Sequence, residues 1–282
     1  MMGRGGDLAR ATGLATVALA ALGARSQVIE TRYRARDLGC ASFFESVRSR
    51  IRGESGTALV EDKAGRDGFL VVKGTETTQG ISVEAWYDSL VVWRVTNTGR
   101  ESPDVEAVLG GRYRGILTPT GQYREVAVPF VPNDIAEVAD LASQMAEFFP
   151  VIPPMELLPG RDWSDSAGSK IRRLSDRRDG REMVRRYEWD RTKRIGDTTA
   201  VTDSLSVMVD QVVREKGELR WSERFGPLGW TRRLAINARI PARGGVKRAV
   251  TSVVEQDIIV NRLFDRAACQ PTPPVGGKRL VP

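Results

Sequence analysis

Apolar and polar residues alternate with a period of two over most of the first half of this chain. A period of two places successive side chains on opposite faces of a strand. Turn signals such as Asp67-Gly68 and Gly110-Gly111 separate the alternating segments. The pattern predicts antiparallel strands over residues 44–51, 69–73, 81–87, 89–95, 112–117 and 123–128.

The second half of the chain continues the same strand pattern. In its last segment Val250, Val254, Ile258 and Val260 share one phase, while charged residues occupy much of the other phase. One face of the sheet should therefore be apolar and the other hydrated. No repeat of 20 to 50 residues is present, which argues against propellers and solenoids. The strands predicted here are 183–189, 201–209, 219–225, 234–240 and 246–264.

One stretch, residues 134–149, has a helical period instead. Asp134 with Glu137 three residues later has the form of a capping box, and Pro150 ends the pattern. We predict a single amphipathic helix that buries its apolar face against the sheet, which gives an α+β, mostly β fold with a large curved antiparallel sheet. The apolar positions of this helix are Ile135, Val138, Leu141, Ala142, Met145, Phe148 and Phe149.

The N-terminus has the features of an export signal. Arg4 and Arg10 precede the apolar run Leu14–Leu22, and Ala24-Arg25-Ser26 fits the small-x-small cleavage rule. We predict a signal peptide over 1–26, cleavage near Ser26, and an extracytoplasmic (periplasmic or secreted) protein. The run is shorter than the about 20 residues that span a bilayer, so the processed chain should not be transmembrane. A membrane anchor or an ordinary first helix is the alternative.

The remaining chain is predicted to form a single β-rich domain over residues 27–265. Its halves, 36–132 and 156–265, lie on either side of the predicted helix. The end of the chain, residues 266–282, is rich in Pro and Gly and is predicted to be a disordered tail.

The two cysteines, Cys40 and Cys269, lie near opposite ends of the processed chain. In an oxidising compartment an even number of cysteines favours a disulfide, here between the first and last strands. Two unrelated buried thiols are the alternative. A bridge across so long a loop would stabilise the protein by about 4 to 5 kcal/mol in the chain-entropy model.

The charge pattern and the missing residue types exclude several functions. The 43 Lys and Arg are interleaved with 36 Asp and Glu, whereas nucleic-acid binders gather basic residues on one face. Histidine is absent, which removes the commonest general base and most zinc sites. Asp162 and Asp165 beside Trp163 form a conceivable acid pair, but a proline–glycine turn explains them more simply. We therefore predict a protein that is not an enzyme and needs no cofactor or metal.

The order of short motifs along the chain adds a family resemblance. A strand ending in Leu117–Tyr123 precedes the helix, and Phe149-Pro150-x-x-Pro153 and Pro159-Gly160-x-x-Trp163 follow it. Over roughly residues 40 to 265 the chain resembles the extracytoplasmic lipoprotein-carrier (LolA/LppX-like) superfamily, especially its uncharacterised bacterial members. The resemblance implies an open half-barrel with helix on its concave face and room for acyl chains. The carrier itself is shorter, and none of its functional residues maps onto a position here.

Two hypotheses about function follow. The first is an exported, non-catalytic binding or carrier module for a lipid or other apolar ligand held between sheet and helix. The second is a structural or protein-interaction component of the cell envelope without a ligand, which requires that no pocket of about 300 Å³ or more remains. Core packing is the alternative explanation for the aromatic residues. Under the first hypothesis the predicted lining residues are Leu141, Met145, Phe148, Trp86, Trp189 and Trp221.

Overall fold

The computed structural model describes residues 30–55, 58–165, 168–202, 205–241 and 249–264. The predicted signal peptide, the predicted tail and Cys269 lie outside the described residues. The disulfide, the domain limits and the cellular location therefore stay predictions.

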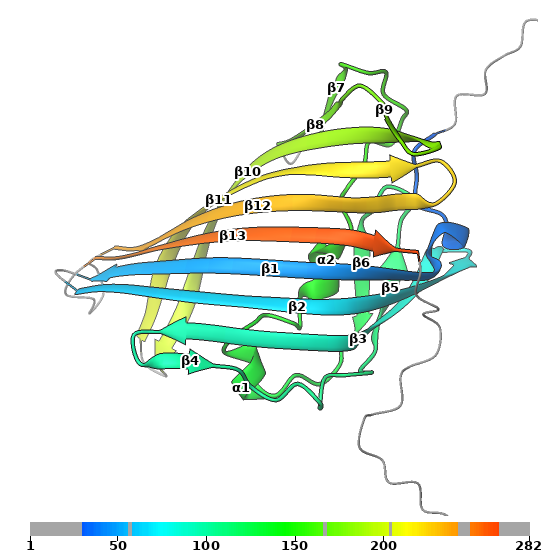
Figure 1. Ribbon diagram of the computed structural model, residues 1–282. Coiled ribbons are helices and arrows are strands. Elements are labelled where there is room, and N and C mark those ends of the chain that lie inside the picture. Colours follow the sequence, from blue (N-terminus) through cyan, green and yellow to red (C-terminus); the bar gives the residue numbers. More distant parts are fainter. Residues whose placement is uncertain (1–29, 56–57, 166–167, 203–204, 242–248, 265–282) are drawn as a thin grey trace, which may run out of the picture.

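The described residues form one antiparallel sheet of thirteen strands (Figure 1). The first six are β1 (Gly39–Ser55), β2 (Ala58–Thr77), β3 (Gly80–Thr96), β4 (Gly99–Glu101), β5 (Tyr113–Leu117) and β6 (Tyr123–Ala127). The other seven are β7 (Asp162–Ser164), β8 (Ser169–Arg173), β9 (Arg177–Asp179), β10 (Glu182–Thr202), β11 (Leu205–Ser222), β12 (Gly226–Ile240) and β13 (Val250–Leu263). The predicted fold class, a mostly β protein built on a large antiparallel sheet, is confirmed.

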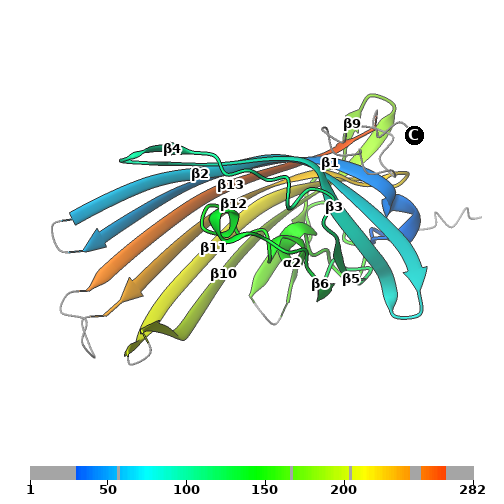
Figure 2. The same ribbon diagram turned by 90° about the horizontal axis from the view of Figure 1, so that it is seen from below.

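The order of the strands explains why the sheet is open. The path runs β6-β5-β3-β2-β1-β13-β12-β11-β10-β8-β7, with β4 added to β3 and β9 added to β10. The first and last long strands thus pair in the centre, while β6 and β7, which are consecutive in the chain, lie at opposite edges. Residues 128–160 connect these two edges across the concave face, as Figure 2 shows. We refer to residues 128–160 as the strap.

The strap contains two short helices where the sequence predicted one. These are α1 (Asn133–Ala136) and α2 (Gln144–Phe148). The prediction of a continuous helix over 134–149 was wrong because local hydrogen bonds replace the helical ones between the two short helices. The Asp140 carboxylate accepts a bond from the Ser143 amide at 3.1 Å, and the Tyr113 hydroxyl donates to the Leu141 carbonyl at 2.9 Å.

Most of the predicted apolar positions of the strap still face the sheet, whereas Ala142 is exposed. Five of them are buried in the common core: Ile135, Leu141, Met145, Phe148 and Phe149. A further short 3₁₀ helix, η1 (Ala35–Leu38), precedes β1. In the described part of the chain no helix combines the length and the apolar character that crossing a bilayer requires.

Aromatic side chains fill one end of the concave face, which we call the closed end. Phe148 of the strap contacts Trp230 of β12 with ring centroids 4.8 Å apart, and Tyr33 contacts Trp221 of β11 at 5.0 Å. Both pairs are edge-to-face, the arrangement that the charge distribution of aromatic rings favours. This packing holds the strap firmly on the sheet at the closed end.

Candidate ligand-binding cavity

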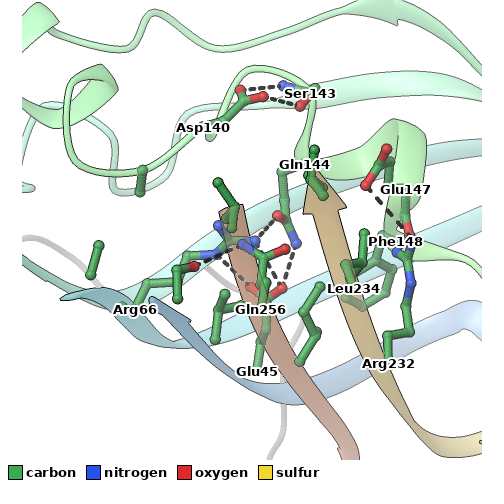
Figure 3. Close-up of a pocket in the computed structure, with 18 of the residues that line it drawn as sticks. Glu45, Arg66, Asp140, Ser143, Gln144, Glu147, Phe148, Arg232, Leu234 and Gln256 are labelled. Atoms are coloured by element: carbon green, nitrogen blue, oxygen red, sulfur yellow. Dashed lines mark hydrogen bonds and ion pairs between the residues drawn. The ribbon is translucent and has the colours of Figure 1, made fainter. Parts of the chain in front are cut away.

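A cavity of about 390 Å³ lies between the strap and the centre of the sheet (Figure 3). This volume falls within the range of about 300 to 1,000 Å³ that small-molecule sites occupy. From the strap, the wall includes Val138, Ala139, Asp140, Ser143, Gln144, Glu147 and Phe148. The apolar part of the floor comprises Val47, Ile51, Ala64, Val213, Trp230, Leu234, Ile236, Val254, Ile258 and Val260.

The register of four central strands produces an aliphatic strip across this floor. Ile51 of β1 pairs with Val254 of β13, which pairs with Ile236 of β12, and Ile236 pairs with Val213 of β11. Side chains at paired positions lie on the same face of a sheet, so the four side chains form one row. All four are only half-buried, because the strap does not fully cover them.

The next row towards the hairpin ends of these strands is made of small or polar residues. Gly53, Ser252, Ala238 and Gln211 occupy the paired positions on β1, β13, β12 and β11. None of these four residues is among the described residues of the cavity wall, so the aliphatic strip borders the cavity on this side.

A buried charged network holds the strap at one side of the cavity. Glu45 of β1 accepts hydrogen bonds from Arg66 at 3.1 and 3.2 Å, from Tyr87 at 2.7 Å and from Gln144 of α2 at 2.7 Å. Arg66 also donates to the side-chain carbonyl of Gln144. Gln144 thus bonds to both members of an ion pair that lies inside the protein.

The surroundings of Glu45 keep its carboxylate charged despite burial. Burial by itself raises the pKa of Glu45, but the charge of Arg66 and the hydrogen bonds from Arg66, Tyr87 and Gln144 outweigh it and lower the pKa below its ordinary value. Glu45 is therefore charged, and its carboxylate oxygens are hydrogen-bonded to Arg66, Tyr87 and Gln144. It is not placed to act as a proton donor.

A second charged network lies at the other side of the cavity. Glu215 of β11 accepts hydrogen bonds from Arg232 and from the Trp189 indole, both at 2.9 Å, and pairs with Arg191. Arg232 also donates to the backbone carbonyl of Glu147 in the strap. The pKa of Glu215 is raised by burial, but the charges of Arg232 and Arg191 reverse this effect and lower it.

A third network fixes the strap where it leaves the closed end. Glu156 of the strap pairs with Arg173 and, at 3.2 Å, with Arg185. The amide of Thr31 donates to Glu156 at 2.9 Å, and the Thr31 hydroxyl lies 2.7 Å from that of Tyr187. These three networks bind the strap to the sheet, and the cavity lies between the first two.

The structure separates the three predicted lining residues of the strap. Phe148 lies in the wall of the cavity. Leu141 and Met145 are completely buried in the core, and neither is among the described residues of the cavity wall.

The three predicted tryptophans lie in three different places, none of them among the described residues of the wall. Trp221 is buried at the closed end. Trp189 is half-buried and hydrogen-bonded to Glu215. Trp86 is buried under the guanidinium of Arg112, 3.7 Å from the ring centroid, and alternates with Ala85 and Tyr87 of the core. Trp86 therefore belongs to the opposite, convex face of the sheet.

Several important residues of the site were missed at the sequence level. Ile51, Ile236 and Val254 belong to predicted strands but were not predicted to line a site, and Trp230 and Val213 lie outside the predicted strands. The charged residues of the networks could be recognised more easily, because each stands at a position of its strand where the alternation otherwise places apolar residues. Glu45 stands between Phe43 and Val47, and Arg232 stands between Trp230 and Leu234.

The acid pair considered in the sequence has a structural role. Asp162 is exposed and lies 2.8 Å from the Lys170 ammonium, whose hydrogen bond and charge lower the pKa of Asp162. Asp165 accepts a bond from the Ser169 amide at 2.8 Å within a turn. A lowered pKa is the opposite of what a general acid needs. In the part of the chain that the structure describes, no cluster of three or more Asp, Glu, Cys or His is placed to hold a metal.

Comparison with known proteins gives no family. No family model and no curated protein matches the chain. A solved structure entitled "Lipid-protein interactions in lipovitellin" is 10% identical with a TM-score of 0.47, covering 82% of this chain and 26% of that chain. The beta domain of the Bordetella autotransporter BrkA is 10% identical with a TM-score of 0.27, covering 79% of this chain and 100% of that chain.

The chain spans about a quarter of the lipovitellin chain. Likenesses this low define neither the fold nor the function of the protein. The resemblance to the lipoprotein-carrier superfamily stays a prediction.

Proposed function

We propose that the protein is an exported, non-catalytic binding or carrier module that holds an acyl chain or a similar apolar group between the strap and the sheet. The observation that carries this proposal is the cavity of about 390 Å³ above the aliphatic strip. The alternative, an envelope component with a filled interior, requires no space of about 300 Å³ or more under the strap. A cavity of this size supports the ligand-binding hypothesis. Export rests on residues 1–26 alone.

The cavity has the chemistry of an acyl-chain site because its charged groups already have partners, and the buried polar atom of the described wall that has none is the indole N–H of Trp230. Glu45, Arg66 and Arg232 are satisfied within their networks, and Gln256 donates to the Ser49 hydroxyl at 3.0 Å. The surface left for a ligand is the aliphatic strip with Trp230 and Phe148. A chain lying there gains the hydrophobic effect without breaking a buried polar contact.

Binding should depend steeply on chain length. Burial of one CH₂ group contributes about 0.8 kcal/mol, which corresponds to about a fourfold change in Kd. For a series of straight-chain fatty acids, we expect the Kd to fall by about this factor per carbon and then to level off when the cavity is full. Isothermal titration calorimetry across the series measures this dependence.

Tryptophan fluorescence gives the direct test, because Trp230 lies in the wall of the cavity. Hexadecanoic acid with bromine atoms in the middle of its chain should quench the fluorescence saturably at one equivalent. Val213→Arg places a charge on the aliphatic strip and should weaken binding by roughly tenfold or more.

Val212→Arg is the matched control, since Val212 lies on the same strand and faces the convex side. It should leave the affinity unchanged. Native mass spectrometry of protein from an envelope fraction should show a bound apolar molecule. Bare polypeptide mass together with no quenching would favour the envelope-component hypothesis instead.

A further inference from the structure

The strap differs in charge from the rest of the protein. Residues 128–160 contain five Asp and Glu and not a single Lys or Arg, although the whole chain has a formal net charge of +7. Glu156 is bonded to Arg173 and Arg185. The other four acids, Asp134, Glu137, Asp140 and Glu147, are exposed.

These exposed acids are only weakly neutralised by the protein itself. Among the described residues, neither Asp134 nor Glu137 has an ion pair within 4 Å. Both border a surface hollow with Arg94, whose guanidinium is already bonded to Asp62 at 2.5 Å. Glu147 lies 3.7 Å from Arg232, which is committed to Glu215. The strap therefore presents a negative surface to solvent.

An exposed apolar ridge directly precedes the acids along the chain. Val126 lies at the register shift at the end of β6, and Val128 and Phe130 follow at the start of the strap, with 63, 41 and 78% of their surfaces exposed. Val128 and Phe130 are two positions apart in an extended segment and therefore point to the same side. Pro129 and Pro132 stiffen this segment, because proline fixes φ. Three neighbouring large apolar side chains in water are more than the scattered exposure that monomers normally show.

We propose that this ridge and the exposed acids of the strap form a docking surface for a basic, amphipathic segment of a partner protein. Apolar side chains of the partner would cover Phe130 and its neighbours, while Lys and Arg would face the four carboxylates. An anionic bilayer surface has the wrong sign of charge for this face. The proposal does not depend on a ligand in the cavity, although Asp140 and Glu147 also border that cavity.

A model peptide tests the proposal because the net charge of the protein opposes the expected result. The probe is a fluorescent amphipathic helix of Leu and Lys, about 18 residues or five turns long. Its comparison peptides have Glu in place of Lys, or Ser in place of Leu. The net positive charge of the chain opposes the binding of a cationic peptide, so binding indicates a local acidic site. We expect only the Leu/Lys peptide to bind well, with affinity that falls as salt is added.

Variants locate the site of binding. Phe130→Ser should raise the Kd of the Leu/Lys peptide roughly tenfold, because the burial of one large side chain is lost. The double variant Asp134→Asn with Glu137→Gln should raise the Kd of the Leu/Lys peptide and make this Kd depend less on the salt concentration. The matched controls are Leu59→Ser, which is 65% exposed on β2, and Glu188→Gln with Asp190→Asn, which are exposed on β10. These controls should leave the Kd unchanged.

Four results would overturn the proposal. The Leu/Glu peptide could bind equally well, or the control variants could weaken binding as much as the strap variants do. Hexadecanoic acid could displace the peptide, which would place the peptide in the cavity. Finally, the strap variants could abolish binding to anionic vesicles or self-association in sedimentation, which would identify a membrane or a second copy as the occupant.

Discussion

Single residues with charge inside the apolar phase determine how the strap is held. Glu45 is 1% exposed and Arg66 7% exposed, yet both lie on the concave face among aliphatic neighbours. A buried ion pair of this kind adds little net stability compared with apolar residues of the same shape. It does, however, give Gln144 of the strap a specific partner at one position. We therefore interpret the pair as a device that fixes where the strap lies.

Removal of one partner of this pair should be costly. Glu45→Gln leaves the Arg66 guanidinium buried without a counter-charge, and we expect a loss of about 3 to 5 kcal/mol in the free energy of unfolding. Urea denaturation followed by far-UV circular dichroism measures it. Glu61→Gln is the control, because Glu61 pairs with Arg50 and Arg52 on an exposed part of β2 and should lose no measurable stability. An equal loss of unfolding free energy in Glu45→Gln and Glu61→Gln would contradict the role that we give to the buried pair of Glu45 and Arg66.

The same carboxylates predict how stability depends on pH. The pKa values of Glu45 and Glu215 in the folded protein lie below the ordinary value of 4.5, so near that pH the unfolded chain binds more protons. Their contribution is complete above about pH 5 and is lost as the pH falls through the folded-state values. The urea midpoint should be constant from about pH 7 to 5.5 and then fall. In Glu45→Gln this acid-side fall should be shallower, and an unchanged slope would show that other groups cause it.

At the scale of strands, close approach of side chains to glycines shapes the concave face. A Cβ atom at Gly217 of β11 would lie 2.5 Å from the Thr231 carbonyl oxygen and closer still to the Trp189 indole, which lies over this glycine. Gly53 of β1 has no atom within 4 Å of such a Cβ. Only the first glycine is required by packing.

A pair of substitutions tests this difference. Gly217→Ala should destabilise the protein by about 1 to 3 kcal/mol, because the added methyl overfills a packed site. It should also shift the emission of Trp189. Gly53→Ala should be neutral or stabilising by up to about 1 kcal/mol, since alanine restricts the unfolded chain. Thermal unfolding of both variants gives the comparison, and similar losses would show that Trp189 does not lie over Gly217.

The strands were largely predictable because their alternation is local. The segments 81–87 and 89–95 were predicted as two strands but form the single strand β3, where the register shifts past Asp88. The alternation also indicates the face on which Trp86 lies, because Trp86 shares its phase with the polar residues Ser82 and Glu84. The helical pattern of 134–149 was real, but a repeat of apolar positions does not show that Asp140 bonds to Ser143 and interrupts the helix.

The cavity itself was not predictable from residue patterns. It exists because the strap crosses the concave face and because β1 pairs with β13, contacts between residues far apart in the chain. A period of two shows which residues share a face, but not which distant strand lies beside them. The row of Ile51, Val254, Ile236 and Val213 therefore became visible only with the register of the sheet.

At the scale of the whole molecule, the central pairing of β1 with β13 predicts how truncation affects folding. These strands are in register from Ser42 opposite Leu263 to Ser55 opposite Val250. A chain that ends at residue 241 lacks β13, so β1 and β12 lose their shared neighbour and the two halves of the sheet separate. We expect this chain to show no cooperative thermal transition and to aggregate through the exposed strand edges.

A chain that ends at residue 264 is the control and should keep a cooperative transition, since it contains every described strand.

The chain that ends at residue 264 lacks Cys269, which lies outside the described residues, and so also tests the predicted bridge to Cys40. If the bridge forms, the shortened chain should unfold at a lower temperature than the intact oxidised chain, consistent with a loss of up to about 4 to 5 kcal/mol. Reduction should lower the unfolding temperature of the intact chain to a similar value and leave that of the shortened chain unchanged. An intact chain whose unfolding temperature is insensitive to reduction would show that the cysteines are unpaired or that their bridge adds no stability, and alkylation with mass spectrometry would distinguish these outcomes.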